Sequence, residues 1–173
     1  MYEKFYKLKE NPFRMTPDSK FFYPSPKHTE ALSSLLYTIQ QRKGFVVITG
    51  EIGAGKTTVC QTLLRKLDLN TRVARVFNTH LTNRELLVAI LEDLEIPYKP
   101  GTKGKLIAQL YDFLVTQAFS GMNVVILVDE AQNLSPTVLE EVRMLSNLET
   151  EKEKLIQIVL VGQPELREKL KLP

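Results

Sequence analysis

The sequence predicts an α/β protein, a three-layer α/β/α sandwich with a mainly parallel sheet. Short β-branched, apolar runs alternate with longer segments whose apolar residues recur at helical spacing. The hydrophobic fraction is 43% and the charged fraction 25% over 173 residues, both ordinary for a globular chain. A single cysteine excludes an intrachain disulfide, and with only 2 histidines the composition argues against a zinc site.

The first predicted helix begins at a proline. Four prolines within residues 10–26 exclude regular helix there. Ser25 is then a good N-cap and Pro26 suits a first turn, so we expect a helix from Pro26 through Gln41, ended by Gly44.

The later elements are predicted from apolar runs, which indicate strands, and from capping residues, which indicate helix starts. The run FVVIT is typical of a strand buried on both faces of a parallel sheet, and NVVILVDE of a central strand that ends in two acids. Thr82 and Glu85 form a capping box, and Ser135-Pro136 opens another helix. Strands are expected at residues 45–49, 72–77, 123–130 and 155–162. Helices are expected at residues 26–41, 56–67, from 82 onward, at 106–119, at 136–148 and from 164 onward.

Residues 50–57 fit the phosphate-loop pattern G-x-x-x-x-G-K-[ST], between a predicted strand and a predicted helix. The glycines remove Cβ atoms from the path of phosphate oxygens, and the loop N–H groups and helix N-terminus attract the anion. Lys56 adds a full charge, and the Thr57 hydroxyl is expected to ligate Mg²⁺. The weaker alternative is a glycine turn that merely joins strand to helix. The predicted nucleotide-binding residues are Gly50, Glu51, Ile52, Gly53, Ala54, Gly55, Lys56, Thr57 and Thr58.

Two acids complete the predicted site. Asp129 and Glu130 come at the carboxyl end of a buried strand, where α/β sheets bind ligands. Asp129 is expected to hold Mg²⁺ directly or through water, and Glu130 to accept a proton from the attacking water. The alternative is that both acids only cap the strand. The phosphate loop upstream favours the catalytic interpretation, and together the motifs indicate a P-loop NTPase that binds a nucleoside triphosphate with Mg²⁺, without separating adenine from guanine.

Six further segments carry a resemblance to a known family. They are ENPFRMTPD (10–18), FFYPSPKHTEALSSLLY (21–37), GFVVITGEIGAGKTT (44–58), VDEAQNLSP (128–136), LSNLET (145–150) and QIVLVGQPELREKL (157–170). Together they resemble the ATPase domain of the general secretion pathway protein A family, which is of the AAA+ type. Such proteins work with a B-type partner in assembling the type II secretion secretin.

The resemblance implies three further roles. Asn78 stands where a polar residue restrains the catalytic glutamate, although an Asn that makes a simple turn is an equal alternative. Gln163 stands where a polar residue senses the γ-phosphate, with an ordinary loop residue as the alternative. Phe13 and its neighbours resemble the strip that covers adenine, with core packing as the competing interpretation.

The resemblance also suggests how the chain is organised. Residues 1–43 correspond to the adenine-side segment and first helix, and residues 44–173 to an AAA+ core that lacks the C-terminal helical lid. An incomplete module lacks its usual trans-acting arginine. Arg143 and Arg167 are stand-in candidates, with surface salt bridging as the better interpretation. Self-association through AAA+ interfaces is implied for a full-length protein, as is membrane attachment through parts outside this chain.

The function expected from motifs and resemblance together is Mg-dependent ATP binding and hydrolysis that drives assembly in type II secretion. The alternative is an AAA+ ATP-dependent DNA-binding regulator of transposition, and a third reading is an assembly module with negligible hydrolysis. A net charge of +3 without a dense basic cluster does not favour nucleic acid. The lone cysteine suits a reducing cytoplasm.

Overall fold

A computed structural model describes residues 5–8 and 23–171 of the chain. The strands are β1 (Phe45–Thr49), β2 (Thr71–Val76), β3 (Asn123–Val128) and β4 (Gln157–Gly162). The helices are α2 (Pro26–Gln40), α3 (Lys56–Lys66), α4 (Asn83–Asp93), α5 (Lys103–Phe119), α6 (Pro136–Leu145) and α7 (Glu165–Leu170), with a short 3₁₀ turn, η2 (Ala131–Asn133). Phe13 and the ENPF segment lie outside the described residues, so their predicted role stays a prediction.

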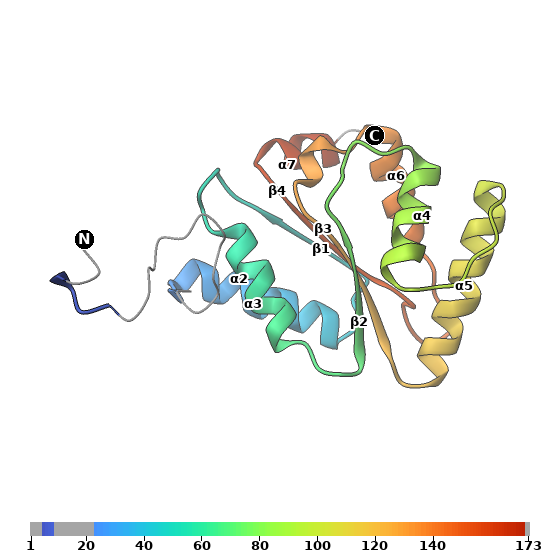
Figure 1. The fold of residues 1–173 in the computed structure, drawn as a ribbon, viewed down its shortest axis with the longest axis horizontal. Coiled ribbons are helices and arrows are strands. Elements are labelled where there is room, and N and C mark those ends of the chain that lie inside the picture. The colour runs from blue at the N-terminus through green and yellow to red at the C-terminus, as the bar shows by residue number, and fades with distance from the viewer. Residues whose placement is uncertain (1–4, 9–22, 172–173) are drawn as a thin grey trace.

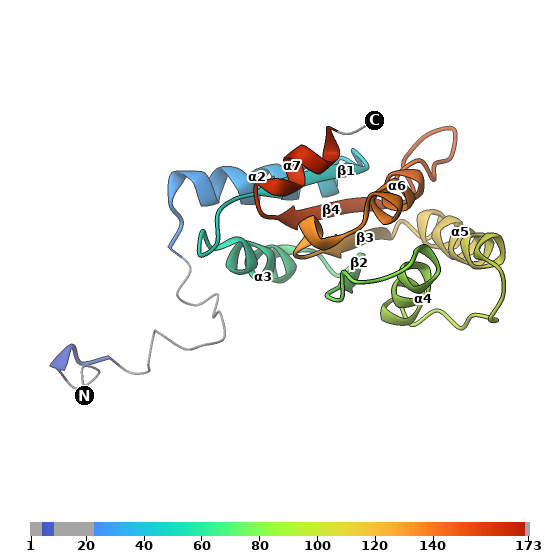
Figure 2. The ribbon, with the colours of Figure 1, turned by 90° about the horizontal axis from the view of Figure 1, so that it is seen from above.

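The four strands form one parallel sheet in the order β1-β4-β3-β2. Thr49 is in register with Gly162, and Val128 with Leu160, so the carboxyl ends of β1, β4 and β3 lie side by side. Helices α2 and α3 cover one face and α4, α5 and α6 the other (Figures 1 and 2). The predicted three-layer sandwich with a parallel sheet is confirmed.

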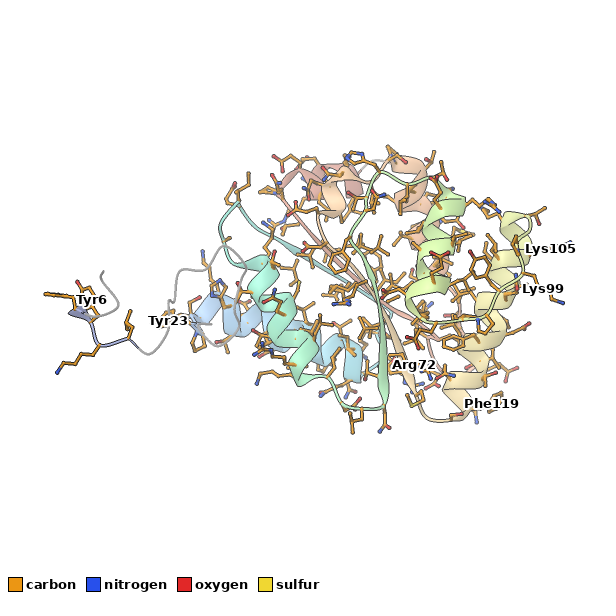
Figure 3. The ribbon with its side chains drawn as sticks, viewed as in Figure 1. Tyr6, Tyr23, Arg72, Lys99, Lys105 and Phe119 are labelled. Atoms are coloured by element: carbon orange, nitrogen blue, oxygen red, sulfur yellow. The ribbon has the colours of Figure 1, made fainter. Side chains whose placement is uncertain are left out.

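Each face of the sheet has its own core, because side chains alternate along a strand. On β3, Val125 and Leu127 pack with α2 and α3, whereas Ile126 and Val128 pack with α4, α5 and α6. The side chains fill the space between the sheet and both helix layers, and Arg72 on β2 lies over the ring of Phe113 from α5 at 5.6 Å (Figure 3). Strands β3 and β4 are therefore packed against helices on both faces, and this packing restricts the movement of their carboxyl ends.

The expectation that residues 45–49 are buried on both faces is wrong. All five residues of β1 are only half-buried, because β1 is an edge strand of the described sheet and β4 covers one side of it. Fully buried apolar side chains line β4 instead. An apolar run of this length does not by itself separate an edge strand from a central one.

Several predicted boundaries also shift. The strand expected to reach residue 130 ends at Val128, because Glu130 adopts a left-handed backbone with φ 51°. The helix expected to reach residue 148 ends at Leu145, after which the chain turns toward a bridge between Glu149 and Lys154. Helix α5 begins three residues before residue 106, at Lys103. Gly44, with φ +88°, lies in the turn after α2 and does not end it.

The three helix starts predicted from capping residues, at Ser25, Thr82 and Ser135, are confirmed. The Ser25 and Ser135 hydroxyls accept hydrogen bonds from backbone N–H groups three residues on, both at 3.3 Å. Thr82 and Glu85 form the reciprocal capping box at the start of α4. None of the helices in residues 5–8 and 23–171 is both long and apolar enough to cross a bilayer.

Cys60 belongs to the core between α2, α3 and the sheet. It is a free cysteine with 5% exposure, and burial raises the pKa of its thiol to about 12. A thiol in such surroundings acts as a small apolar side chain. Helix α2 packs on the same core, and the division of the chain at residue 43 stays a prediction.

Candidate nucleotide-binding site

The candidate site lies where the chain leaves the carboxyl ends of β1, β4 and β3. These ends are neighbours in the sheet, so the loops that follow them converge at one edge. The N–H of Gly50, which opens the phosphate loop, donates to the carbonyl of Gly162 at 3.2 Å. This hydrogen bond ties the loop after β1 to the end of β4, one residue before Gln163.

The phosphate loop, residues 50–57, turns directly into α3. Gly53 and Gly55 have φ of 79° and 82°, values that side chains with a Cβ rarely adopt. A Cβ on Gly55 would also lie 3.1 Å from Nε2 of His28, whose ring hydrogen-bonds with the Ala54 carbonyl at 2.8 Å. Gly55 is the N-cap of α3 and has no side chain, so no cap side chain occupies the N–H groups of the first turn.

The outer surface of the phosphate loop is exposed to solvent. Ile52 is 81% exposed, and Glu51, Gly53 and Ala54 are also exposed. Lys56 folds over the loop, where its Nζ donates to the carbonyls of Gly50 at 2.7 Å and Glu51 at 2.9 Å. The loop therefore combines N–H donors, a helix N-terminus and one ammonium group, which is the chemistry that binds a polyphosphate.

Asp129 and Thr57 lie near each other, although Asp129 follows β3 and Thr57 follows β1. Burial raises the pKa of Asp129, while the hydrogen bond from the Glu130 N–H, the charge of Lys56 and the nearby Thr57 side chain act in the opposite direction. A half-buried carboxylate beside a hydroxyl supplies the hard oxygen ligands that Mg²⁺ takes when phosphates complete its coordination.

This donor set suits a metal that arrives with its substrate. Among the described residues, no group of three or more His, Cys, Asp and Glu side chains is placed to hold a metal ion. Mg²⁺ is usually held by one or two carboxylates with substrate phosphates and waters. The Thr57–Asp129 pair fits that arrangement.

Glu130 is held by two amides. Its Oε2 accepts hydrogen bonds from Nε2 of Gln132 at 2.6 Å and from Nε2 of Gln163 at 3.4 Å. The Gln132 hydrogen bond holds the pKa of Glu130 below its ordinary value, and the Gln163 bond acts in the same direction. The lowered pKa keeps the carboxylate ionised, which a general base requires, and also makes it a weaker base.

Sequence reasoning missed Gln132. Its Oε1 accepts from the Gln163 N–H at 3.0 Å, so it joins the ends of β3 and β4. We call Glu130, Gln132 and Gln163 the edge cluster. The only signal in the sequence was the polar residue two positions after Glu130, and nothing local shows that its amide reaches across to another strand.

The remaining predicted residues lie on three other parts of the fold. Asn78 follows β2, and its Oδ1 accepts from the N–H of His80 at 3.0 Å, the geometry of a turn. Arg143 makes a two-bond ion pair with Glu140 on the exposed side of α6. Arg167 is exposed on α7. The structure thus shows Asn78 in the turn geometry, and its restraining role stays a prediction.

Comparison with protein families agrees with this geometry. Residues 39–170 match the AAA domain family, which is most of the described chain. The chain belongs to the AAA domain family. This match includes the phosphate loop, both acids and the edge cluster. The family resemblance found in the sequence is therefore confirmed.

A curated relative matches this chain over the whole length of the chain. General secretion pathway protein A of Aeromonas hydrophila is 47% identical over 174 residues, covering 100% of this chain. The chain spans 32% of that relative's length. The activity and partners of the whole relative are therefore matters for proposal.

Solved structures share the fold. The ORC2 protein of Aeropyrum pernix, solved as ADPNP–ADP complexes, has a TM-score of 0.60 at 15% identity and covers 85% of this chain and 44% of its own. The Cdc6p protein of Pyrobaculum aerophilum also has a TM-score of 0.60, at 21% identity, and covers 89% of this chain and 47% of its own. At these identities the likeness concerns the AAA fold.

Proposed function

We propose that this AAA domain binds ATP with Mg²⁺ and hydrolyses it. One observation carries the proposal: Thr57 of the phosphate loop lies near enough to Asp129 to lower the pKa of its carboxylate, and the Glu130 carboxylate is next in the chain. A phosphate binder alone needs only the loop. The two oxygen ligands and the adjacent carboxylate are what phosphoryl transfer requires in addition.

Binding would use the loop backbone. The N–H groups from Gly53 to Thr58 and the N-terminus of α3 are expected to surround the β- and γ-phosphates. Lys56 would exchange its hydrogen bonds to the Gly50 and Glu51 carbonyls for bonds to phosphate oxygens. Thr57 and Asp129 would hold Mg²⁺, which when bound neutralises phosphate charge.

In the proposed hydrolysis, the attacking water would be activated at the edge cluster. A water attacks the γ-phosphorus, its proton passes to the Glu130 carboxylate, and the bond to the β,γ-bridging oxygen breaks with its electron pair going to ADP. Gln163, which lies beside Glu130, is placed to donate an amide hydrogen to the γ-phosphate or the water. The domain thereby contributes mainly position and charge, because phosphoryl transfer asks for little covalent chemistry from the protein.

The biological setting is proposed from the relative. The 47% identity to General secretion pathway protein A supports a role in general secretion, where ATP turnover would drive assembly together with a B-type partner and through self-association. We place the domain in the cytoplasm, where ATP and a reduced Cys60 are expected. The comparisons do not favour the alternative of a DNA-binding regulator of transposition.

The decisive experiment measures ATP binding and turnover by this chain with and without Mg²⁺. A fluorescent ATP analogue gives the dissociation constant, and phosphate release gives kcat at several protein concentrations. We expect Mg²⁺-dependent turnover that exceeds that of Glu130→Gln. Binding with equal turnover in the two proteins would contradict hydrolysis and support an assembly module that only binds nucleotide.

Concentration dependence tests the proposed self-association. A trans-acting arginine is worth about 10³-fold or more in related phosphoryl-transfer systems. We expect turnover per chain to rise with concentration if a neighbouring copy supplies that group. A rate per chain that stays constant over the whole range would exclude activation by self-association for this chain.

A further inference from the structure

We propose that Gln132 is a positioning residue that orients the Glu130 carboxylate for attack by water. The inference rests on the ATPase function proposed above. Its basis is a side-chain bridge: one end of the Gln132 amide donates to Glu130 at 2.6 Å, and the other accepts from the Gln163 backbone at 3.0 Å. Both halves of the amide are therefore used, so its orientation is fixed.

The bridge selects one carboxylate oxygen of Glu130. Gln132 and Gln163 both donate to Oε2, at 2.6 Å and 3.4 Å. A carboxylate oxygen that already accepts two hydrogen bonds is a poor acceptor for a third partner. The geometry therefore assigns Oε1 to the attacking water, and Gln132 determines which way Oε1 points.

The surroundings leave Gln132 little freedom to move. A Cβ on Gly162 would lie 2.8 Å from Oε1 of Gln132 and 3.3 Å from its backbone nitrogen. The Gln132 side chain thus occupies space that only a glycine at the end of β4 leaves open. Glu130 is constrained as well, because its backbone is in the left-handed region and its N–H donates to Asp129 at 2.9 Å.

The fold of η2 does not depend on the Gln132 side chain. Ala131 and Leu134, on either side of it, are fully buried in the core. Lys169 on α7 donates to the backbone carbonyls of Gln132 and Leu134, at 2.5 Å and 3.0 Å, and those carbonyls remain after substitution. Truncation of Gln132 therefore removes the bridge while the anchors of η2 stay in place.

The test compares Gln132→Ala with the wild type and with Gln40→Ala as a matched control. Gln40 is an exposed glutamine at the end of α2, far along the chain from the edge cluster. For Gln132→Ala we expect kcat to fall by about 10- to 100-fold, since small misplacements of a catalytic group have effects of this size. The dissociation constant for a fluorescent ATP analogue should stay within about twofold, because the loop is untouched. Gln40→Ala should match the wild type in both.

Gln132→Glu adds a second, independent perturbation. It keeps the length of the side chain but replaces the donor with a carboxylate beside Glu130, so kcat should fall at least as far as in Gln132→Ala. Thermal melting of each variant reports whether the fold is retained. Normal turnover by a folded Gln132→Glu protein would overturn the proposal.

A double-mutant cycle separates positioning from a general structural effect. If Gln132 acts through Glu130, adding Gln132→Ala to Glu130→Gln should change kcat by less than about twofold, because coupled residues are non-additive. Independent losses that multiply would refute the proposal. If wild-type protein binds ATP but does not turn it over, the proposed function itself fails, and that outcome is distinct from an active wild type with an unaffected Gln132→Ala variant.

Discussion

The phosphate loop and the edge cluster meet at the same edge of the sheet but are built in opposite ways. The loop is continuous in sequence and presents backbone N–H groups, with glycines at φ of 79° and 82° where a Cβ is disfavoured. The edge cluster brings together side chains from the ends of β3 and β4, with Glu130 and Gln163 separated by 33 positions. Local sequence specifies the loop, whereas packing of the central strands assembles the cluster.

This difference suggests that the phosphate loop mainly determines nucleotide affinity and the edge cluster mainly determines turnover. In the proposed mechanism, backbone groups and one ammonium bind phosphate in every state of the reaction, so changes in the loop should alter affinity first. In the same mechanism, the carboxylate and amide groups of the cluster act on the attacking water, so changes there should alter turnover first. Five substitutions, grouped in four tests, probe the two regions and their surroundings, in order of decreasing expected effect.

Replacing Glu130 by Gln should have the largest effect. Removing a general base lowers turnover by about 10²- to 10⁴-fold. Nucleotide affinity should stay close to wild type, since the amide occupies the same volume and the loop is intact. Phosphate release and equilibrium binding measure the two quantities. Glu151→Gln, an exposed glutamate in the loop before β4, is the control. A loss of affinity as large as the loss of turnover would contradict the proposal that the loop determines affinity and the edge cluster determines turnover.

Replacing Lys56 by Ala should weaken ATP binding. A hydrogen bond to a charged group contributes about 1.5–3 kcal/mol, which corresponds to about 10- to 100-fold in the dissociation constant. Lys66→Ala is a matched control, because Lys66 is exposed in the last turn of the same helix. Titration with a fluorescent ATP analogue gives both constants. Unchanged affinity for Lys56→Ala would show that the Lys56 ammonium does not contribute to phosphate binding.

The glycines of the loop offer a matched pair. An L-residue with a Cβ in the left-handed region costs about 1–2 kcal/mol, so Gly53→Ala and Gly55→Ala should both lower the free energy of unfolding. Gly55→Ala should lower it further, because its Cβ would lie 3.1 Å from His28 whereas nothing lies within 4 Å of a Cβ on Gly53. Chemical denaturation gives the two values. Equal losses would show that His28 yields to the added methyl group.

Replacing Asn78 by Ala should have the smallest effect. Its Oδ1 accepts one exposed hydrogen bond from His80, so we expect a loss of about 0.5–1.5 kcal/mol in stability and little change in turnover. Thermal melting and phosphate release measure the two. A change in kcat of more than about twofold would instead support the restraining role implied by the family resemblance.

Several features of the fold could be predicted from local chemistry. The capping residues Ser25, Thr82 and Ser135 start their helices as expected, because a side-chain oxygen satisfies N–H groups within the same turn. The phosphate loop is equally local, and its position between a strand and a helix is confirmed. The burial of β1 was misjudged, since edge or central position depends on which strand pairs beside it.

The candidate site also has some features that the sequence predicts and others that depend on tertiary structure. The sequence by itself determined the phosphate loop, the two acids after β3 and the parallel α/β class, because each follows from a local pattern of residue types along the chain. Tertiary structure alone decided that Gln163 donates to Glu130 and that Gln132 hydrogen-bonds with both. These contacts depend on the order β1-β4-β3 in the sheet and on a glycine at the end of β4, which place side chains from distant positions within hydrogen-bonding distance.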